Sequence, residues 1–219
     1  MTVKATAVLF GILSIIACPF VTMSASAGST IVALGDSLTA GYGLPPGQGF
    51  AEQLQDALRA RGHDVSVIDA GASGDTSTGG LARLDWSVPE DADAVIVELG
   101  ANDALRGLDP SITRKALSDI VKRLKARGQK VLLAGMRAPP NLGDVYAAEF
   151  DAIYPDLAAA EDVPLYPFFL DGVAADASLN LADGIHPTSE GVARIVEKIL
   201  PSVETLIVKA GAPAGSKAD

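Results

Sequence analysis

Short apolar runs alternate with longer segments of helical periodicity along most of this chain. Each apolar run has the length of a buried strand, and the runs cover 31–34, 65–68, 94–99, 130–134 and 163–166. Between them, apolar residues recur every three or four positions, which predicts helices over 49–61, 76–84, 112–127, 145–161 and 189–208. Pro155 and Pro201 fall inside two of these helices and are expected to kink or break them.

This alternation predicts one α/β domain built on a parallel sheet, because strand-helix-strand units cross over with one hand and bury the sheet between two helical layers. We expect a flavodoxin-like three-layer α/β/α sandwich with a five-stranded parallel sheet in the order 2-1-3-4-5. The loops after Leu34, Ile68 and Leu99 would then converge at the carboxyl edge of the sheet. The segment 100–103 is expected to form a glycine-rich polar turn there.

The two ends of the chain differ in composition from the rest. Lys4, an apolar stretch over 5–16 and the small residues 25–27 predict a signal peptide over 1–27, and hence a periplasmic or secreted protein. A lipoprotein cleavage site before Cys18 is the alternative. The folded domain is expected over 28–209. A disordered tail rich in Gly, Ala and Pro is expected over 210–219.

Composition narrows the classes of function. With 219 residues, 48% hydrophobic, the chain can bury one substantial core. Its net charge of −10, without a run of Lys or Arg, argues against nucleic acid as a partner. We also expect the mature form to be a monomer without a membrane span. The one cysteine lies in the predicted leader, so no disulfide is expected. Because only two histidines are present, no transition-metal site is predicted.

Ser37 is a candidate nucleophile because Gly35-Asp36-Ser37 follows a strand directly. The alternative is a serine that caps a helix or forms a turn. A serine nucleophile needs a base, and the chain offers His63 and His186. His63 lies in a helix-ending turn and is expected to be solvated. His186 precedes Pro187, which favours an extended backbone, and Asp183 lies three residues before it.

A carboxylate from Asp183 on the Nδ1 of His186 would leave Nε2 free to take the serine proton, although a hydrogen-bonded loop is the alternative for this segment. Three donors could stabilise an oxyanion: the Ser37 amide, the Gly74 amide and the Asn102 side chain. Gly74 and Asn102 could equally be turn residues. Apolar residues that could line an acyl groove, or simply pack, are Leu38, Leu81, Leu105, Ile185 and 139–142.

Four blocks now form a pattern: Gly35-Asp-Ser-Leu38, Ser73-Gly-Asp-Thr76, Gly100-Ala-Asn-Asp103 and Asp183-Gly-Ile-His186. In this order they resemble the SGNH (GDSL-type) hydrolase superfamily over 30–208. The resemblance implies a Ser37 nucleophile, with His186 oriented by Asp183. It also implies oxyanion donors from Gly74, Asn102 and the Ser37 amide, and no cofactor.

Three further segments, 40–44, 80–84 and 163–169, are similar to the branch of bacterial arylesterases, acyl-CoA thioesterase I and lysophospholipase L1. The resemblance implies hydrolysis of esters and thioesters with acyl chains. Ala101 and Asp69 depart from residues common in that branch, glycine and asparagine. Thr39 breaks the Gly-x-Ser-x-Gly pattern of the α/β-hydrolases. A carbohydrate O-acetyl esterase of the same fold and a non-catalytic binding module remain the alternatives.

Overall fold

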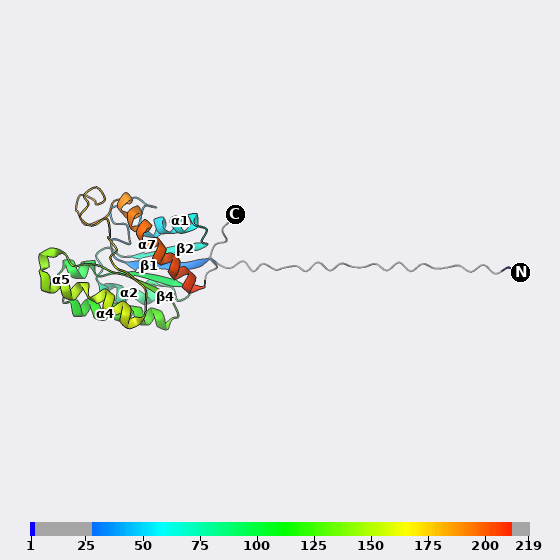
Figure 1. Cartoon of the computed structure of the whole chain (residues 1–219), viewed down its shortest axis with the longest axis horizontal. Helices are drawn as coiled ribbons and strands as arrows, with labels where there is room; N and C mark the ends of the chain where they lie inside the picture. The colour runs from blue at the N-terminus through cyan, green and yellow to red at the C-terminus, as the bar shows by residue number, and fades with distance from the viewer. Residues whose placement is uncertain (3–27, 212–219) are drawn as a thin grey trace.

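The computed structural model describes residues 1–2 and 28–211, and residues 28–211 form a three-layer α/β/α sandwich (Figure 1). The five strands are parallel and lie in the order β2-β1-β3-β4-β5, as the alternation of elements predicted. Their bounds are β1 Ser29–Gly35, β2 Val65–Gly71, β3 Ala94–Glu98, β4 Lys130–Ala134 and β5 Leu165–Tyr166.

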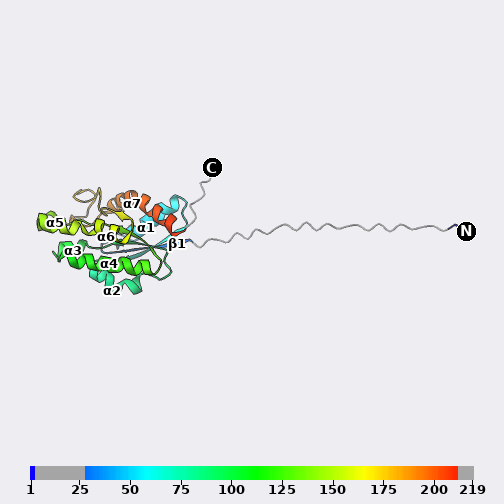
Figure 2. The same ribbon diagram turned by 60° about the horizontal axis from the view of Figure 1, so that its bottom comes forward.

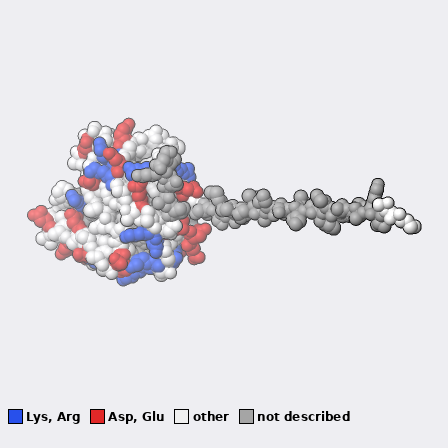
Figure 3. All heavy atoms as spheres, turned by 45° about the vertical axis from the view of Figure 1, so that its right-hand side comes forward, with Lys and Arg blue, Asp and Glu red and all other residues white. Residues whose placement is uncertain are grey.

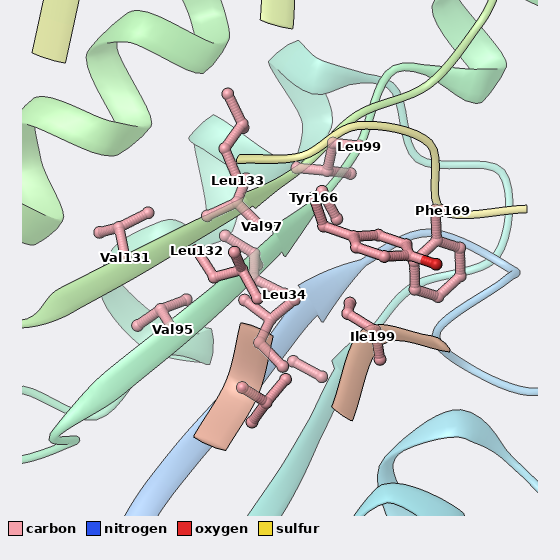
Figure 4. Close-up of a cluster of buried hydrophobic side chains, with 14 of the residues drawn as sticks. Leu34, Val95, Val97, Leu99, Val131, Leu132, Leu133, Tyr166, Phe169 and Ile199 are labelled. Atoms are coloured by element: carbon pink, nitrogen blue, oxygen red, sulfur yellow. The ribbon is translucent and has the colours of Figure 1, made fainter. Parts of the chain in front are cut away.

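Two helical layers enclose the sheet, with α1 and α7 on one face and α2 and α4 on the other (Figure 2). The helices are α1 Phe50–Ala60, α2 Ser77–Ser87, α3 Ala101–Leu105, α4 Pro110–Ala126, α5 Asp144–Asp151, α6 Ile153–Glu161 and α7 Ser189–Ala210, with a 3-10 turn over Pro140–Leu142. Because both faces are covered, the central strands β1 and β3 are apolar along nearly their whole length. Figure 4 shows this core, where Leu34 and Val97 lie near Ile199 of α7 and Phe169.

Two helical predictions differ from the structure, and a third is confirmed. The segment 100–103 is not only a turn, because helix α3 begins at Ala101, directly after Gly100 with φ 119°. The predicted helix over 145–161 is broken, as expected from Pro155; the break is at Ala152, and Pro155 lies in the first turn of α6, where no helical carbonyl needs its missing N–H.

Pro201 does not interrupt α7, which runs continuously from Ser189 to Ala210. The helix carries buried apolar residues on both sides of the proline, including Ile199 and Val203. A proline inside a helix costs about 3 kcal/mol, because it removes one backbone hydrogen bond and its ring crowds the preceding turn. The packing of these residues outweighs that cost. Ala210, where the tail was expected to begin, is the last residue of the helix. The rest of that tail (212–219) and most of the predicted signal peptide (3–27) lie outside the described residues.

The surface in Figure 3 carries basic and acidic side chains interspersed on the face in view. Ion pairs in the described part of the chain include Arg114 with Asp156 at 3.0 Å and Lys198 with Asp171 at 2.7 Å. No helix in the described part of the chain is long and apolar enough to cross a bilayer.

Candidate active site

Ser37 lies in a tight turn at the carboxyl end of β1, and its conformation is fixed by backbone contacts. The Asp36 carboxylate accepts a hydrogen bond from the Leu38 amide at 3.0 Å, and the Ala40 amide donates to the Asp36 carbonyl at 3.0 Å. A side chain at Gly35 would collide with the Thr39 hydroxyl. Only glycine therefore lets the chain turn this tightly, and the turn presents the Ser37 hydroxyl at the edge of the sheet.

The structure brings together Ser37 and His186, which are 149 residues apart in the sequence. The Nε2 atom of His186 lies 2.9 Å from the Ser37 hydroxyl, and its Nδ1 atom lies 2.7 Å from Asp183 Oδ2. When Nδ1 carries the proton and donates it to Asp183, Nε2 is the acceptor for the serine hydroxyl. This geometry fits a serine, its base and the carboxylate that orients the base.

The loop that carries His186 is held at both of its ends. The Leu181 amide donates to the His186 carbonyl at 2.7 Å, and the Thr188 amide donates to the Leu179 carbonyl at 2.9 Å. Asp183 Oδ1 accepts from the Ile185 and His186 amides at 2.9 and 3.0 Å. These amides, together with the imidazole, lower the pKa of Asp183 to about 2, so the carboxylate is ionised at all ordinary pH values.

Asn102 extends from the second position of α3 toward the same turn. Its Nδ2 atom donates one hydrogen bond to Asp36 Oδ2 at 3.0 Å, which leaves the second N–H of the amide for a ligand. Burial raises the pKa of Asp36 to about 6, and the hydrogen bonds from Leu38 and Asn102 oppose that rise. The ionised form of Asp36 therefore orients Asn102 at neutral pH.

Gly74 lies in the loop after β2 with φ 84°, a conformation that favours glycine. Its carbonyl accepts a hydrogen bond from Arg106 Nη2 at 2.7 Å, which ties this loop to the end of α3. Unlike Ser37, Asn102 and His186, Gly74 is not among the residues that line the main cavity at this edge.

A cavity of about 440 Å³ opens beside Ser37 and His186. It is lined mostly by apolar side chains: Leu38, Ala101, Leu105, Met136, Ala138, Pro139, Pro140, Phe168, Leu170, Ala174, Ala175 and Ile185. Leu38, Leu105 and Ile185 were expected in such a groove. Leu81 was also considered but lies against another hollow between α2 and α4, and Asn141 and Leu142 do not line the cavity.

Two residues of this site were missed by sequence reasoning. Glu98, the last residue of β3, is buried beneath the nucleophile turn and accepts hydrogen bonds from the Thr39 hydroxyl at 2.8 Å and the Asp36 amide at 3.4 Å. Burial and the nearby Asp36 charge raise the pKa of Glu98 well above its usual value. The available signal was a carboxyl group ending an otherwise apolar strand.

The second is Tyr42, whose ring lies 4.5 Å from the His186 ring, centroid to centroid, at an angle of 38°. Its short segment, 40–44, carried part of the sequence resemblance, but no spacing rule placed it against the imidazole. Tyr42 therefore packs against His186 and helps to hold the imidazole in place.

His63 was expected to be solvated, and this was wrong. Its side chain is 11% exposed, and its Nε2 atom lies 3.2 Å from Glu204 of α7. Glu204 also pairs with Arg61 at 3.0 Å, so the His63 side chain lies against α7, although Arg61 and Gly62 of the same turn are exposed. Among residues 1–2 and 28–211, no group of His, Cys, Asp and Glu side chains is arranged to hold a metal ion.

Comparisons with known proteins identify the family of the chain. A model of the GDSL-like Lipase/Acylhydrolase family matches residues 33–194. The chain is 41% identical over 183 residues to the esterase TesA of Pseudomonas aeruginosa, covering 83% of this chain and 91% of that protein. It is 38% identical over 187 residues to thioesterase 1/protease 1/lysophospholipase L1 of Escherichia coli K12, covering 85% and 88%. The crystal structure of AlinE4, an SGNH-hydrolase family esterase, is 46% identical with a TM-score of 0.70, covering 83% and 98%.

Proposed function

The chain belongs to the GDSL-like lipase/acylhydrolase family and is a serine carboxylic ester hydrolase, and from this premise we propose that it works through an acyl-enzyme on Ser37. The observation that carries the proposal is the chain of two contacts, Ser37 hydroxyl to His186 at 2.9 Å and His186 to Asp183 at 2.7 Å. A serine hydroxyl is a weak nucleophile until a base takes its proton. These contacts provide the base and hold it in the required tautomer.

The reaction proceeds in two halves at the same atoms. Ser37 Oγ attacks the acyl carbonyl while His186 Nε2 takes the hydroxyl proton, and the resulting imidazolium gives that proton to the leaving alcohol or thiol. A water molecule, deprotonated by His186, then attacks the acyl-enzyme and releases the acid. The Asp183 carboxylate stabilises the imidazolium that forms in each half, and the Tyr42 ring packs against it.

The oxyanion of each tetrahedral intermediate needs fixed donors, and each is worth about 3 to 4 kcal/mol in the transition state. We assign them to the Ser37 amide, the Asn102 side chain and the Gly74 amide. Asn102 is supported by its bond to Asp36 and by its place in the cavity wall. Gly74 is supported by its sequence block and by the contact of its carbonyl with Arg106.

The apolar cavity beside Ser37 supports acyl esters and thioesters as substrates, including lysophospholipid-like ones. An apolar wall gains about 0.8 kcal/mol for each buried methylene, so medium acyl chains should bind better than acetyl groups. This reasoning disfavours an acetylated sugar. It also predicts that rates rise gradually with chain length until the cavity is filled.

The test is a panel of 4-nitrophenyl esters of increasing chain length, an acyl-CoA, a lysophospholipid and an acetylated sugar. Ser37→Ala should abolish turnover of every substrate, and Ser202→Ala, a serine on α7 away from the cavity, should retain the parent rates. Equal rates in Ser37→Ala and the parent would refute the assignment. Faster turnover of the acetylated sugar than of the medium-chain esters would contradict the acyl-chain preference.

We also infer that residues 1–27 are an export signal, so that the enzyme acts in the periplasm or outside the cell. We expect it to act there as a monomer. Expression of the full chain in a bacterium, followed by N-terminal sequencing of the exported product, tests this. A product that begins at Gly28 supports it. A lipidated product that begins at Cys18, or no export, would contradict it.

A further inference from the structure

The cavity beside Ser37 has an unusual charge distribution for this protein. The chain carries 27 acidic and 17 basic residues, yet no carboxylate side chain lines the cavity. The charged or chargeable groups in its wall are Arg137 and the catalytic candidate His186. Arg137 is exposed, so water solvates its charge at the rim of the cavity. From this position its guanidinium can meet an anion that enters the cavity.

Arg137 is not engaged by protein acceptors in the described part of the chain. No carboxylate there lies within 4.0 Å of its guanidinium, and its N–H groups make no hydrogen bond to protein. Asp171 is near enough for Arg137 to contribute to lowering its pKa, but Lys198 already pairs with Asp171 at 2.7 Å. The in-plane donors of Arg137 are available to a ligand.

The fold fixes the location of Arg137. The guanidinium carbon lies 4.8 Å from the centre of the Phe168 ring, and Phe168 lines the same cavity. On either side, the Phe169 amide donates to the Gly135 carbonyl at 2.8 Å, and the Ala138 amide donates to Asp151 at 2.8 Å. A ring against one face of a guanidinium leaves its edge free, and that edge matches the oxygens of a carboxylate or phosphate.

We propose that Arg137, held against Phe168, is an anion-binding group of the acyl cavity, and that it selects esters or thioesters carrying a negatively charged oxygen group. The proposal rests on the proposed function, because it concerns the substrate of the same site. The anionic group could be carried by the acyl chain, as a terminal carboxylate, or by the leaving group, as a phosphate. Both present the same chemistry to the guanidinium.

Two matched substrate pairs distinguish these sources. The first pair is the 4-nitrophenyl monoester of adipic acid and its methyl-capped neutral analogue. The second is a 1-acyl glycerol phosphate and the 1-monoacylglycerol with the same acyl chain. In each pair, the kcat/KM of the anionic substrate divided by that of the neutral one is the anion preference, which cancels general effects on folding and catalysis.

Arg137→Gln should lower the anion preference about tenfold for at least one pair, mainly through KM, because a charge-assisted hydrogen bond is lost. Arg137→Lys should have an anion preference between those of the parent and Arg137→Gln, because the charge remains but the planar donors stacked on Phe168 are lost. Arg123→Gln makes the same change in net charge on an exposed part of α4 and should leave both preferences unchanged. In 1 M salt, the anion preference of the parent should fall toward that of Arg137→Gln. At this ionic strength the Debye length is about 3 Å, so salt screens the attraction between the guanidinium and the anion.

If Arg137→Gln lowers the anion preference of the first pair, the anionic group that Arg137 binds is on the acyl chain. If it lowers the anion preference of the second pair, that group is on the leaving group. Either result supports the proposal. Anion preferences within twofold of the parent for both pairs in Arg137→Gln, or an equal fall in Arg123→Gln, would overturn it. Ser37→Ala separates the two proposals: if it still hydrolyses these substrates, the proposed function fails, whereas an inactive Ser37→Ala with unchanged Arg137→Gln preferences refutes only the role of Arg137.

Discussion

Replacing Gly100 by alanine should damage both the stability and the catalysis of this enzyme. Gly100 links β3 to α3 with φ 119°, a conformation that L residues with side chains rarely adopt. A Cβ atom there would also collide with the Tyr154 hydroxyl and lie 3.4 Å from Tyr154 Cζ. Tyr154 is buried and donates to the Leu99 carbonyl at 2.9 Å, so it cannot move without breaking that bond.

The cost has two parts. Forcing alanine into this backbone region costs about 1 to 3 kcal/mol. Displacing Tyr154 leaves the buried Leu99 carbonyl without its partner, which adds about 1 to 3 kcal/mol. Together they amount to about 4 kcal/mol, which for a domain of this size lowers Tm by about 10 °C. Because Asn102 follows two residues later, a displaced α3 should also lower kcat by about a hundredfold.

Thermal unfolding followed by circular dichroism, together with kcat on a 4-nitrophenyl ester, measures both effects. Gly128→Ala is the matched control, because Gly128 has φ 81° but nothing within 4 Å of an added Cβ. It should show a smaller fall in Tm and an unchanged kcat. A double-mutant cycle with Tyr154→Phe should recover about 1 kcal/mol of the Gly100→Ala loss, since the colliding oxygen is removed.

Two outcomes would refute this reasoning. One is a Gly100→Ala variant that melts within about 2 °C of the parent and keeps its kcat, which would mean that the strand-helix junction relaxes without cost. The other is strict additivity with Tyr154→Phe. Additivity would show that the predicted collision is absent.

Three further predictions concern the surroundings of the site. Glu98→Ala leaves the Thr39 hydroxyl and the Asp36 amide unpaired and should cost about 3 kcal/mol in urea unfolding, with Glu98→Gln closer to the parent because it keeps an oxygen acceptor; equal losses would contradict the importance of these two hydrogen bonds. Because the pKa of Asp183 is lowered, the stability that its ionised form contributes should be present above about pH 4 and lost as pH falls toward 2. Asp183→Asn should lack this pH dependence in unfolding experiments. If its unfolding free energy falls with pH in parallel with that of the parent, Asp183 does not contribute this stability. Ala175→Gly should raise Tm by about 2 °C, because φ 65° strains alanine but not glycine; a lower Tm would contradict the strain.

The sequence predicted both the order of the strands and the proximity of Ser37 to His186. Alternating apolar runs and helices allow few topologies, and parallel strands place their carboxyl ends at one edge. The fold class, the family and the class of enzyme are confirmed. The catalytic roles of individual residues stay predictions, although the observed distances are those that the roles require.

What escaped prediction depends on contacts between elements that are distant in sequence. His63 lies in a turn that looks exposed until α7 brings Glu204 over it. Arg137 and Phe168 meet only because β4 and β5 are neighbours. The raised pKa of Glu98 follows from its complete burial, which no local spacing rule reveals. In each case the missing information was the three-dimensional neighbour.

The most direct test of the central claim, that Ser37 attacks the acyl group with His186 as its base, is the labelling of the protein with a fluorophosphonate followed by peptide mass spectrometry. Nucleophilic attack on phosphorus displaces fluoride, so a stable adduct marks the activated hydroxyl. The account predicts one adduct, on the peptide containing Ser37, forming far more slowly in His186→Ala. An adduct on another residue, or an equal labelling rate in His186→Ala, would contradict it.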